Sequence, residues 1–397
     1  DMKVQRCLPG FDPQLSQIAI MGSFGKPGER RLRENASHRS RPIPISGDAS
    51  SHIRFDVMVE GHAASAILDT GATVTAVDLE FSQLLGLSVR QGFRANGLAG
   101  TIAGAYAECL KIDIGGCVIE VPAVVLDLSP IGTATRAPVN IVLGQDVLRT
   151  SIVDIDFPPR RLQILPPEFL ADVERAFGPP MSLKSTRDGL LATSMSIVGH
   201  PRITGAIDFG SNVALYVSPE YASSISLLEG REVGTGISAG VEGLEVSRMI
   251  VVPDLEILST TFTEVPVQIP SRWLLSPQAV IGSPVLRRFR VILNCAGSCG
   301  WFIPHPPALL EPFPKDRSGI GAMPAGNRLR IVHISPGGPA DIAGLVVGDD
   351  IVSIDGEPID EAYLRSGNRV GTRPAGTIVS IGLANRSIHK IRLQDYF

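Results

Sequence analysis

The sequence, 397 residues long, lacks the features that would place it in several large classes of protein. It has no apolar run near the ~18 residues that a membrane-spanning helix needs. The apolar stretch 121–126, for example, ends at Asp127. An excess of positive charge is also missing, because the net charge is -4, and this indicates that nucleic acid is not a partner. With 44% hydrophobic and 19% charged residues, the composition is that of a globular protein of two or three domains.

Cysteines are few and odd in number, so the five cannot all pair with one another. Cys295 and Cys299 flank a stretch containing Gly and Ser that suits a tight turn, and the ends of such a hairpin lie close enough for a disulfide bond. Buried free thiols are the alternative, and the sequence leaves both open.

The N-terminal region, residues 1–50, carries Gly, Pro and Ser together with a basic run at 30–33. This composition predicts an extended or loosely packed arm, either a mobile tail or a segment that covers a cleft. Because the first residue is Asp1 and not methionine, we expect that an upstream segment has been removed.

One short motif occurs twice, and the rest of the chain is organised around it. Asp69 lies in Leu-Asp-Thr-Gly-Ala-Thr, and Asp208 in Ile-Asp-Phe-Gly-Ser-Asn. Apolar residues precede Asp69 and β-branched residues follow it, so one strand enters a sharp Gly turn and another leaves. The pattern places a carboxylate at the tip of each loop. Two matching loops indicate one shared active site.

A nearly constant offset connects the two halves of the repeat. Subtracting 69 from 208 gives 139, and the same offset pairs Gly71 with Gly210. Further along, Gly144 and Gly282 each end an apolar segment, and they are 282 - 144 = 138 residues apart. Independent motifs rarely keep such register, so the halves are predicted to be structural repeats.

At these residues the chain resembles the aspartic proteases, with two lobes fused as in the pepsin-like enzymes and with short, retropepsin-like halves. The resemblance implies a mainly β fold of two pseudo-symmetric lobes, with Asp69 and Asp208 as the catalytic pair. We predict lobe one at 51–166, a connection at 167–184 and lobe two at 185–304. The resemblance also implies that a set of residues supports the active-site loops: Thr70, Gly71, Gly144, Gly210, Ser211 and Gly282.

The mechanism implied is acid-base catalysis by two carboxylates that share one proton, and it needs no metal or cofactor. The ionised carboxyl takes a proton from a bound water while the other donates to the scissile carbonyl. Ser211 follows the second Gly and could hydrogen-bond Asp208, whereas Ala72 offers Asp69 no hydroxyl. By this asymmetry we expect Asp208 to be the ionised member of the pair.

Glycine-rich segments between each aspartate and its partner Gly motif match the place of the flap hairpin in this family. Glycines would give a flap tip its positive φ angles and mobility, although an ordinary exposed hairpin is the alternative. The candidate flap and substrate-binding residues are Gly97, Gly100, Tyr106 and Gly236.

Phe209 raises a rival interpretation, a binding protein built on an inactive protease fold. In the family, the Thr or Ser after each aspartate makes a reciprocal hydrogen bond to the opposite loop. Thr70 can make this bond and Phe209 cannot. The loss of one bond, about 1 kcal/mol, should weaken the locking of the loops without removing either carboxylate. Activity therefore remains the preferred prediction, with slow turnover.

A proline-rich linker is predicted at 305–317, and the pattern then changes over 318–397. This last segment resembles a PDZ domain of the bacterial protease-associated type. The resemblance implies that a peptide adds as a strand and that amides of the loop Ile320-Gly321-Ala322 hold its terminal carboxylate, with a helix near 360–365 as the other wall. A domain that packs on the protease as a structural lid is the alternative. The type of domain predicts an exported, periplasmic protein whose partners are a protein or peptide substrate and a C-terminal peptide ligand.

Two other chemistries were considered from local motifs. Asp208-Phe209-Gly210 is also the magnesium-binding tripeptide of protein kinases, but the His-Arg-Asp loop and the strand lysine that a kinase needs are not present. The stretch 236–240 fits the Gly-x-Ser-x-Gly turn of serine hydrolases, which must lead into a helix. Here 244–250 alternates like a strand, so both interpretations are set aside.

Overall fold

The computed structural model describes residues 41–47, 52–96, 101–135, 137–240, 243–365 and 369–397. Most of the predicted N-terminal arm lies outside these residues, as do the candidate flap glycines Gly97 and Gly100. The described part of the arm, residues 41–47, packs on the protein. Its strand β1 (Ile43–Pro44) pairs with a strand between the lobes, and the side chains of Ile43 and Ile45 are buried.

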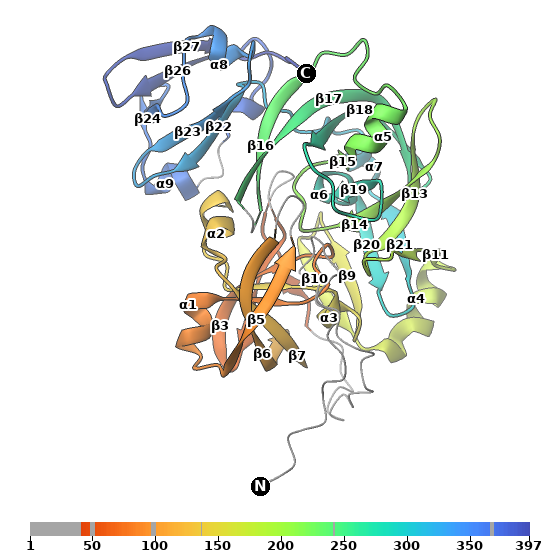
Figure 1. Cartoon of the computed structure of the whole chain (residues 1–397). Coiled ribbons are helices and arrows are strands. Elements are labelled where there is room, and N and C mark those ends of the chain that lie inside the picture. The colour runs from red at the N-terminus through yellow and green to blue at the C-terminus, as the bar shows by residue number, and fades with distance from the viewer. Residues whose placement is uncertain (1–40, 48–51, 97–100, 136, 241–242, 366–368) are drawn as a thin grey trace.

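Lobe one is a single sheet of seven strands in the order β2-β3-β8-β4-β7-β6-β5 (Figure 1). An additional pairing between β2 and β6 curls the sheet toward closure, and its inward residues form the core of the lobe. The strands are β2 (Arg54–Val59), β3 (His62–Leu68), β4 (Ala76–Asp78), β5 (Val89–Asn96), β6 (Thr101–Ile114), β7 (Cys117–Leu126) and β8 (Ile141–Leu143), with helices α1 (Leu79–Leu84), α2 (Ser129–Thr135) and α3 (Gln145–Leu148).

Lobe two repeats this sheet with one short strand added at its edge, in the order β12-β13-β14-β19-β15-β18-β17-β16. Its additional pairing, β13 with β17, corresponds to β2 with β6 in lobe one. Its strands are β12 (Lys184–Ser185), β13 (Leu191–Ile197), β14 (Ile203–Asp208), β15 (Leu215–Val217), β16 (Gly234–Gly240), β17 (Gly243–Ile257), β18 (Thr260–Pro270) and β19 (Ala279–Gly282), with helices α5 (Pro219–Ser224) and α6 (Ser283–Leu286).

The two sheets match strand for strand, so the prediction of a mainly β chain with two pseudo-symmetric lobes is confirmed. In each lobe the strand that ends at the aspartate runs parallel to the strand that ends at the downstream Gly motif. These pairs are β3 with β8 and β14 with β19. The equivalent pairing explains why the sequence offset survives over both motifs.

A third sheet joins the lobes, in the order β1-β10-β9-β20-β21-β11. Its centre is the pairing of β9 from the end of lobe one with β20 from the end of lobe two, in which Ile155 lies opposite Val291. Helix α4 lies in the connection between β10 and β11, and its Val173 is buried. The elements are β9 (Ile152–Asp156), β10 (Arg161–Leu165), β11 (Met181–Ser182), β20 (Phe289–Asn294), β21 (Cys299–Pro304), η1 (Pro167–Phe169) and α4 (Leu170–Phe177).

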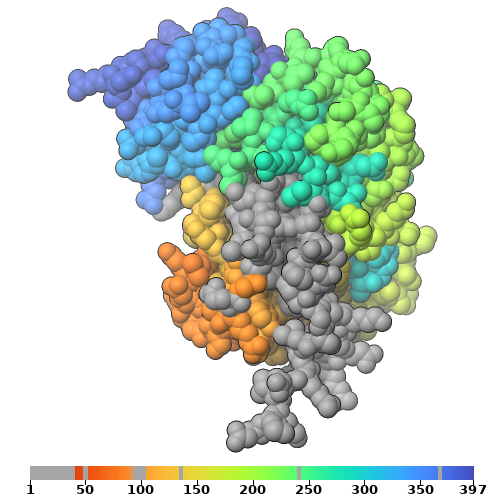
Figure 2. All heavy atoms as spheres, viewed as in Figure 1, coloured from red at the N-terminus to blue at the C-terminus, as the bar shows by residue number. Residues whose placement is uncertain are grey.

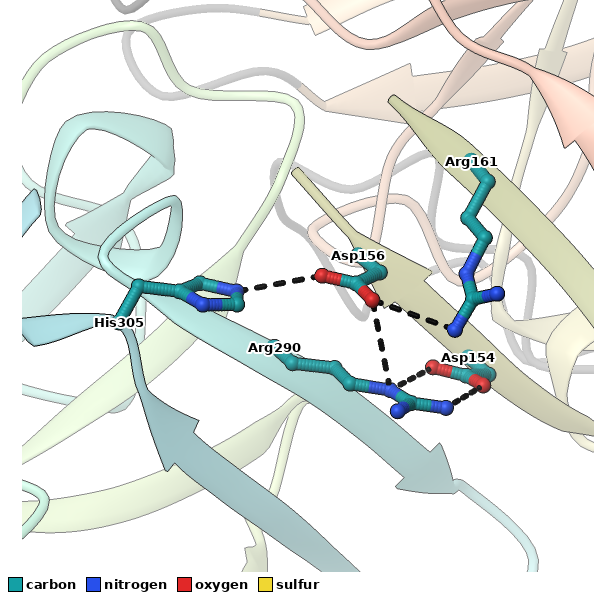
Figure 3. A network of polar contacts seen from close by, with 5 residues as sticks. All are labelled: Asp154, Asp156, Arg161, Arg290 and His305. Atoms are coloured by element: carbon teal, nitrogen blue, oxygen red, sulfur yellow. Dashed lines mark hydrogen bonds and ion pairs between the residues drawn. The ribbon is translucent and has the colours of Figure 1, made fainter. Parts of the chain in front are cut away.

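A network of charged side chains crosses this central pairing (Figure 3). Arg290 of β20 makes two hydrogen bonds to Asp154 of β9, with Nε–Oδ1 and Nη2–Oδ2 distances of 2.9 and 2.6 Å. Asp156 lies 3.2 Å from both Arg161 Nη2 and His305 Nε2. Bidentate, partly buried Arg–Asp pairs are the stronger kind of ion pair, so the network stabilises the pairing of β9 with β20 between the lobes.

The C-terminal segment forms a separate sheet in the order β22-β23-β24-β26-β27, with β25 paired to β24. Its core is apolar and separate from that of the lobes. Its strands are β22 (Ile320–Pro324), β23 (Leu329–Ile334), β24 (Asp350–Ile354), β25 (Glu357–Pro358), β26 (Ile378–Leu383) and β27 (Ile388–Arg392), with α8 (Pro339–Ile342), α9 (Glu361–Arg365) and η2 (Val370–Thr372).

The proline-rich linker between lobe two and this domain packs against lobe two. It contains α7 (Pro306–Leu309), and the guanidinium of Arg288 donates to the carbonyl of Ala308 at 2.6 Å. The same guanidinium lies 3.8 Å from the ring centroid of Phe313, which is buried. The linker therefore positions the domain as a fixed spacer would.

The C-terminal domain also contacts strand β16 of lobe two directly (Figures 1 and 2). The backbone N–H of Thr235 donates to Ser335 Oγ at 2.9 Å, and Thr235 Oγ1 lies 3.0 Å from His333 Nε2. Next to these bonds, the side chain of Ile237 packs on Gly321. Figure 2 shows the domain resting on the surface of lobe two, so it is docked and not freely tethered.

The fold also bears on the predicted disulfide bond and on membrane-spanning helices. Cys295 and Cys299 both carry free thiols, so the disulfide bond left open by the sequence is not formed. Burial raises the pKa of the Cys295 thiol to about 12. In the described parts of the chain, no helix is both long and apolar enough to cross a bilayer.

Candidate active site

Asp69 and Asp208 meet at the boundary between the lobes. Asp69 follows β3 and Asp208 ends β14, and their side chains hydrogen-bond each other. A Cβ added to Gly71 would lie 2.8 Å from Asp208 Cγ, and one added to Gly210 would lie closer still to Asp69 Cγ. Each carboxyl thus rests on the glycine of the opposite loop, where no larger residue fits.

Backbone N–H groups orient each carboxyl from its own loop. Ala72 N donates to Asp69 Oδ1 at 2.9 Å, and Gly210 N donates to Asp208 Oδ1 at 2.7 Å. Both aspartates keep part of their surface accessible. Paired, oriented carboxyls that solvent can reach are the arrangement that acid-base work on a bound water requires.

The protonation of the pair is the reverse of our expectation. Burial raises the pKa of both carboxyls, but that of Asp208 is raised much further, because the nearby charge of Asp69 adds to the burial. The hydrogen bond from Asp208 in turn lowers the pKa of Asp69. This direction favours the shared proton on Asp208, and the titration itself belongs to the pair.

Ser211 does not acidify Asp208 as the sequence led us to expect. Its Oγ accepts from the backbone N–H of Val213 at 3.3 Å and lies 3.4 Å from the carbonyl of the same residue. The hydroxyl is used to close its own turn. This is the physical reason why the predicted asymmetry between Asp69 and Asp208 failed.

Thr70 makes the cross-lobe hydrogen bonds, and only from one side. Its hydroxyl donates to the carbonyl of Ile207 at 2.8 Å and accepts from the backbone N–H of Phe209 at 3.0 Å. The ring of Phe209 is fully buried, with its centroid 6.1 Å from that of Phe157. The side chain of Phe209 therefore packs in the core and makes no hydrogen bond between the loops.

The two downstream glycines allow a close crossing beneath the active-site loops. A Cβ on Gly144 would lie 2.6 Å from the carbonyl carbon of Val74, and one on Gly282 would overlap the carbonyl oxygen of Val213. Val74 and Val213 are themselves 213 - 74 = 139 residues apart. The supporting role predicted for both glycines therefore has a steric basis.

Sequence reasoning missed a matched pair of supporting residues. Gln145 Nε2 donates to the carbonyl of Thr70 at 2.7 Å, and Ser283 Oγ donates to the carbonyl of Phe209 at 3.0 Å. The two donors are 283 - 145 = 138 residues apart, which is the offset of the downstream glycines, so the repeat itself carried the signal. Each holds the backbone of the residue that follows one aspartate of the pair.

His52 was also missed, because no motif surrounds it. Its ring interacts with the backbone of Gly210 in the opposite lobe, and burial together with the positive charge of Arg54 lowers its pKa to about 4. Its Nδ1 is buried without a hydrogen-bond partner in the described structure. The imidazole is thus neutral at physiological pH and lies beside the second active-site loop.

Beside the first active-site loop is another carboxyl that the sequence did not single out. Asp146 accepts hydrogen bonds from the backbone N–H and the hydroxyl of Thr75, at 3.0 and 2.7 Å. Burial raises the pKa of Asp146 to about 6. The Thr75 hydroxyl in turn accepts from Gly144 N at 3.2 Å, which connects this carboxyl to the glycine crossing.

The described flap candidates occupy ordinary strand positions. Tyr106 lies within β6, opposite Arg90 on one side and Val124 on the other. Gly236 lies within β16 and is not among the glycines with positive φ. The reason for a glycine there is contact, because a Cβ would lie 2.6 Å from the sulfur of Met249. The positive-φ explanation that we gave for Gly236 is therefore wrong.

The three residues predicted to bind a peptide in the C-terminal domain lie on its edge strand β22. Ile320 and Ala322 pack against the core of the domain. Gly321 points away from that core, and a Cβ there would lie 2.8 Å from Ile237 of lobe two. We expected Gly321 to leave room for a peptide carboxylate, and instead it leaves room for lobe two.

The end of the second active-site loop and the edge of the C-terminal domain line one cavity of about 350 Å³. Asn212 and Val213 line it beside the second active-site loop, and Ala322 and Tyr363 line it in the C-terminal domain. In the described parts of the chain, no cluster of three or more His, Cys, Asp or Glu side chains could hold a metal ion.

Comparison with known families agrees with this geometry. Residues 55–147, which include the loop of Asp69, match the family model described as aspartyl protease. Residues 330–367 match the model described as PDZ domain.

Proposed function

Since the chain contains an aspartyl protease domain at residues 55–147 and a PDZ domain at residues 330–367, we propose that it is an aspartic endopeptidase. It would hydrolyse peptide bonds of protein substrates with a water activated between Asp69 and Asp208. The observation that carries this proposal is the contact between the two carboxyls, each seated on the glycine of the opposite loop.

In the proposed reaction, ionised Asp69 accepts a proton from the bound water as its oxygen attacks the scissile carbonyl carbon. Protonated Asp208 donates its proton to the carbonyl oxygen, which gives a neutral tetrahedral intermediate. Collapse breaks the C–N bond, and the proton now on Asp69 passes to the leaving nitrogen. Asp208 recovers its proton from the intermediate, so the pair returns to its starting state.

A second candidate is a binding protein with weak or no hydrolysis, acting through its cleft and PDZ domain. The observation that favours it is Phe209, whose apolar side chain cannot form a hydrogen bond to the opposite loop. Of the two residues that directly follow the aspartates, only Thr70 joins the loops through its side chain. Both carboxyls and their orienting N–H donors are nevertheless in place, which supports the endopeptidase.

Cleavage of an unstructured protein substrate by wild type, Asp69→Asn and Asp208→Asn tests the proposal. Each variant should lose at least a thousandfold in rate, because shared-proton catalysis needs both groups. Asp172→Asn, on the exposed face of α4, should retain the wild-type rate. Wild-type rates in either dyad variant would exclude the mechanism, and a wild type that cleaves nothing would favour the binding protein.

Thermal unfolding of the same variants separates folding from chemistry. A carboxyl whose pKa is raised in the folded state stabilises the protein at low pH, and this stability is lost as the pH rises through the folded-state pKa. Asp208→Asn removes that loss, so its Tm relative to wild type should increase from acidic to neutral pH.

A further inference from the structure

The turn just before β22, next to the predicted carboxylate-binding residues Ile320-Gly321-Ala322, already contains a carboxylate from its own chain. Asp316 accepts hydrogen bonds from the backbone N–H groups of Ser318 and Gly319, at 3.2 and 2.8 Å. It also accepts from the hydroxyls of Ser318 at 2.7 Å and Tyr396 at 3.0 Å. Four donors on one side chain make a filled anion site.

The next N–H in the loop is also engaged. The backbone N–H of Ile320 donates to Ser318 Oγ at 3.2 Å. The negative charge of Asp316, together with burial, raises the pKa of Tyr396. A terminal carboxylate arriving here would find the N–H of Ile320 engaged and the like charge of Asp316 close by.

The strand edge that follows the loop remains available. In the described part of the chain, β22 pairs only with β23, so its other edge carries backbone groups that no strand satisfies. This edge faces the cavity of about 350 Å³, and Tyr363 of α9 lines the opposite side. The volume is within the range of ligand-binding pockets, about 300–1,000 Å³.

The same cavity reaches the catalytic loops. His52, Asn212 and Val213, all beside the loop of Asp208, line it together with Ile320 and Ala322. An extended chain added to β22 would therefore share one cavity with the end of the loop that carries Asp208. The edge of β22 and this side of the loop line the same space.

We infer that the PDZ domain holds an internal, extended segment of the substrate polypeptide by strand addition to β22, without recognising a C-terminal carboxylate. The substrate class is then unfolded or locally extended protein, whatever the position of its C-terminus. This inference rests on the proposed function, because it identifies the substrate of the same cleft. Asp316 is the residue that prevents recognition of a terminal carboxylate.

The test compares two forms of one extended apolar peptide, with a free C-terminal carboxylate and with a C-terminal amide. Binding to full-length Asp69→Asn protein is measured by calorimetry, and hydrogen–deuterium exchange locates the contact. Both peptides should bind with Kd values within twofold and should protect the amides of β22. A tenfold preference for the carboxylate, or no protection of β22 by either peptide, would overturn the inference.

Asp316→Ser empties the anion site and should create a preference for the carboxylate of about tenfold that wild type lacks. If that variant unfolds, Asp316→Asn keeps the shape of the side chain and removes only its charge, and it should shift the preference in the same direction. No preference in a folded variant would show that Asp316 does not govern recognition.

Cleavage by wild type distinguishes a failure of this inference from a failure of the proposed function. If wild type cleaves the peptides but β22 stays unprotected, the endopeptidase stands and the role of the PDZ domain is wrong. Protection of β22 without any cleavage would keep the binding mode and reject the endopeptidase.

Discussion

The hydroxyl of Thr70 accepts a hydrogen bond of 3.0 Å from the backbone N–H of Phe209, and the side chain of Phe209 offers nothing in return. Of the two side chains that directly follow the aspartates, only Thr70 of lobe one therefore forms hydrogen bonds to the opposite loop. One hydroxyl therefore makes the side-chain hydrogen bonds between the loops that two equivalent hydroxyls could have shared.

We expect Thr70→Val to destabilise the protein by about 1–3 kcal/mol, because it leaves buried backbone groups of Ile207 and Phe209 without their partner. Activity should fall more than tenfold as the loops lose their alignment. Denaturant unfolding and cleavage assays measure the two effects. Thr150→Val, which removes a local hydroxyl bond outside the active site, should leave activity unchanged.

Phe209→Thr should not rescue the missing bond. Removing a fully buried phenylalanine ring costs about 3–5 kcal/mol, whereas one new hydrogen bond returns about 1 kcal/mol. We therefore expect a net loss of about 2–4 kcal/mol in chemical denaturation. The control Phe157→Leu alters the same ring contact without touching an active-site loop and should retain activity. A Thr variant as stable as wild type would show that the ring contributes little to packing.

The sequence was sufficient to predict the two lobes, the dyad and the glycines beneath it, because each of these is a local pattern that occurs twice. What failed was side-chain direction. The hydroxyl of Ser211 turns toward Val213, and this depends on how the loop closes. The contact of Gly321 with Ile237 depends on how two distant segments dock, for which a sequence pattern carries no signal.

Asp146→Asn is expected to change how stability depends on pH. The pKa of Asp146 is raised from 3.8 to about 6, so its contribution is fully present below about pH 3.8 and is lost as the pH rises through about 6. The Asn variant cannot ionise, and it should gain up to about 3 kcal/mol relative to wild type between acidic and neutral pH. Urea unfolding at several pH values checks this. A constant difference across the range would mean that Asp146 does not titrate as described.

Gly321→Glu should undock the PDZ domain and not merely block its edge, since the new Cβ would lie 2.8 Å from Ile237. Small-angle scattering should report a larger radius of gyration, and the linker 305–317 should become sensitive to added protease. Combining the change with Ile237→Ala makes room for the side chain and should restore much of the compactness. If the double variant is as expanded as the single one, the contact with Ile237 is not what docks the domain.

Because one sheet joins the two lobes, we expect them to unfold together as a single unit. Val291 of β20 lies opposite Ile155 of β9, and Arg290 is bound to Asp154 across the same pairing. We expect that neither lobe is stable by itself, because a separated lobe would expose an unpaired central strand that can pair with other chains. Expression of a half-molecule should therefore yield aggregates or self-paired halves, and a nick in the connection should leave both halves associated.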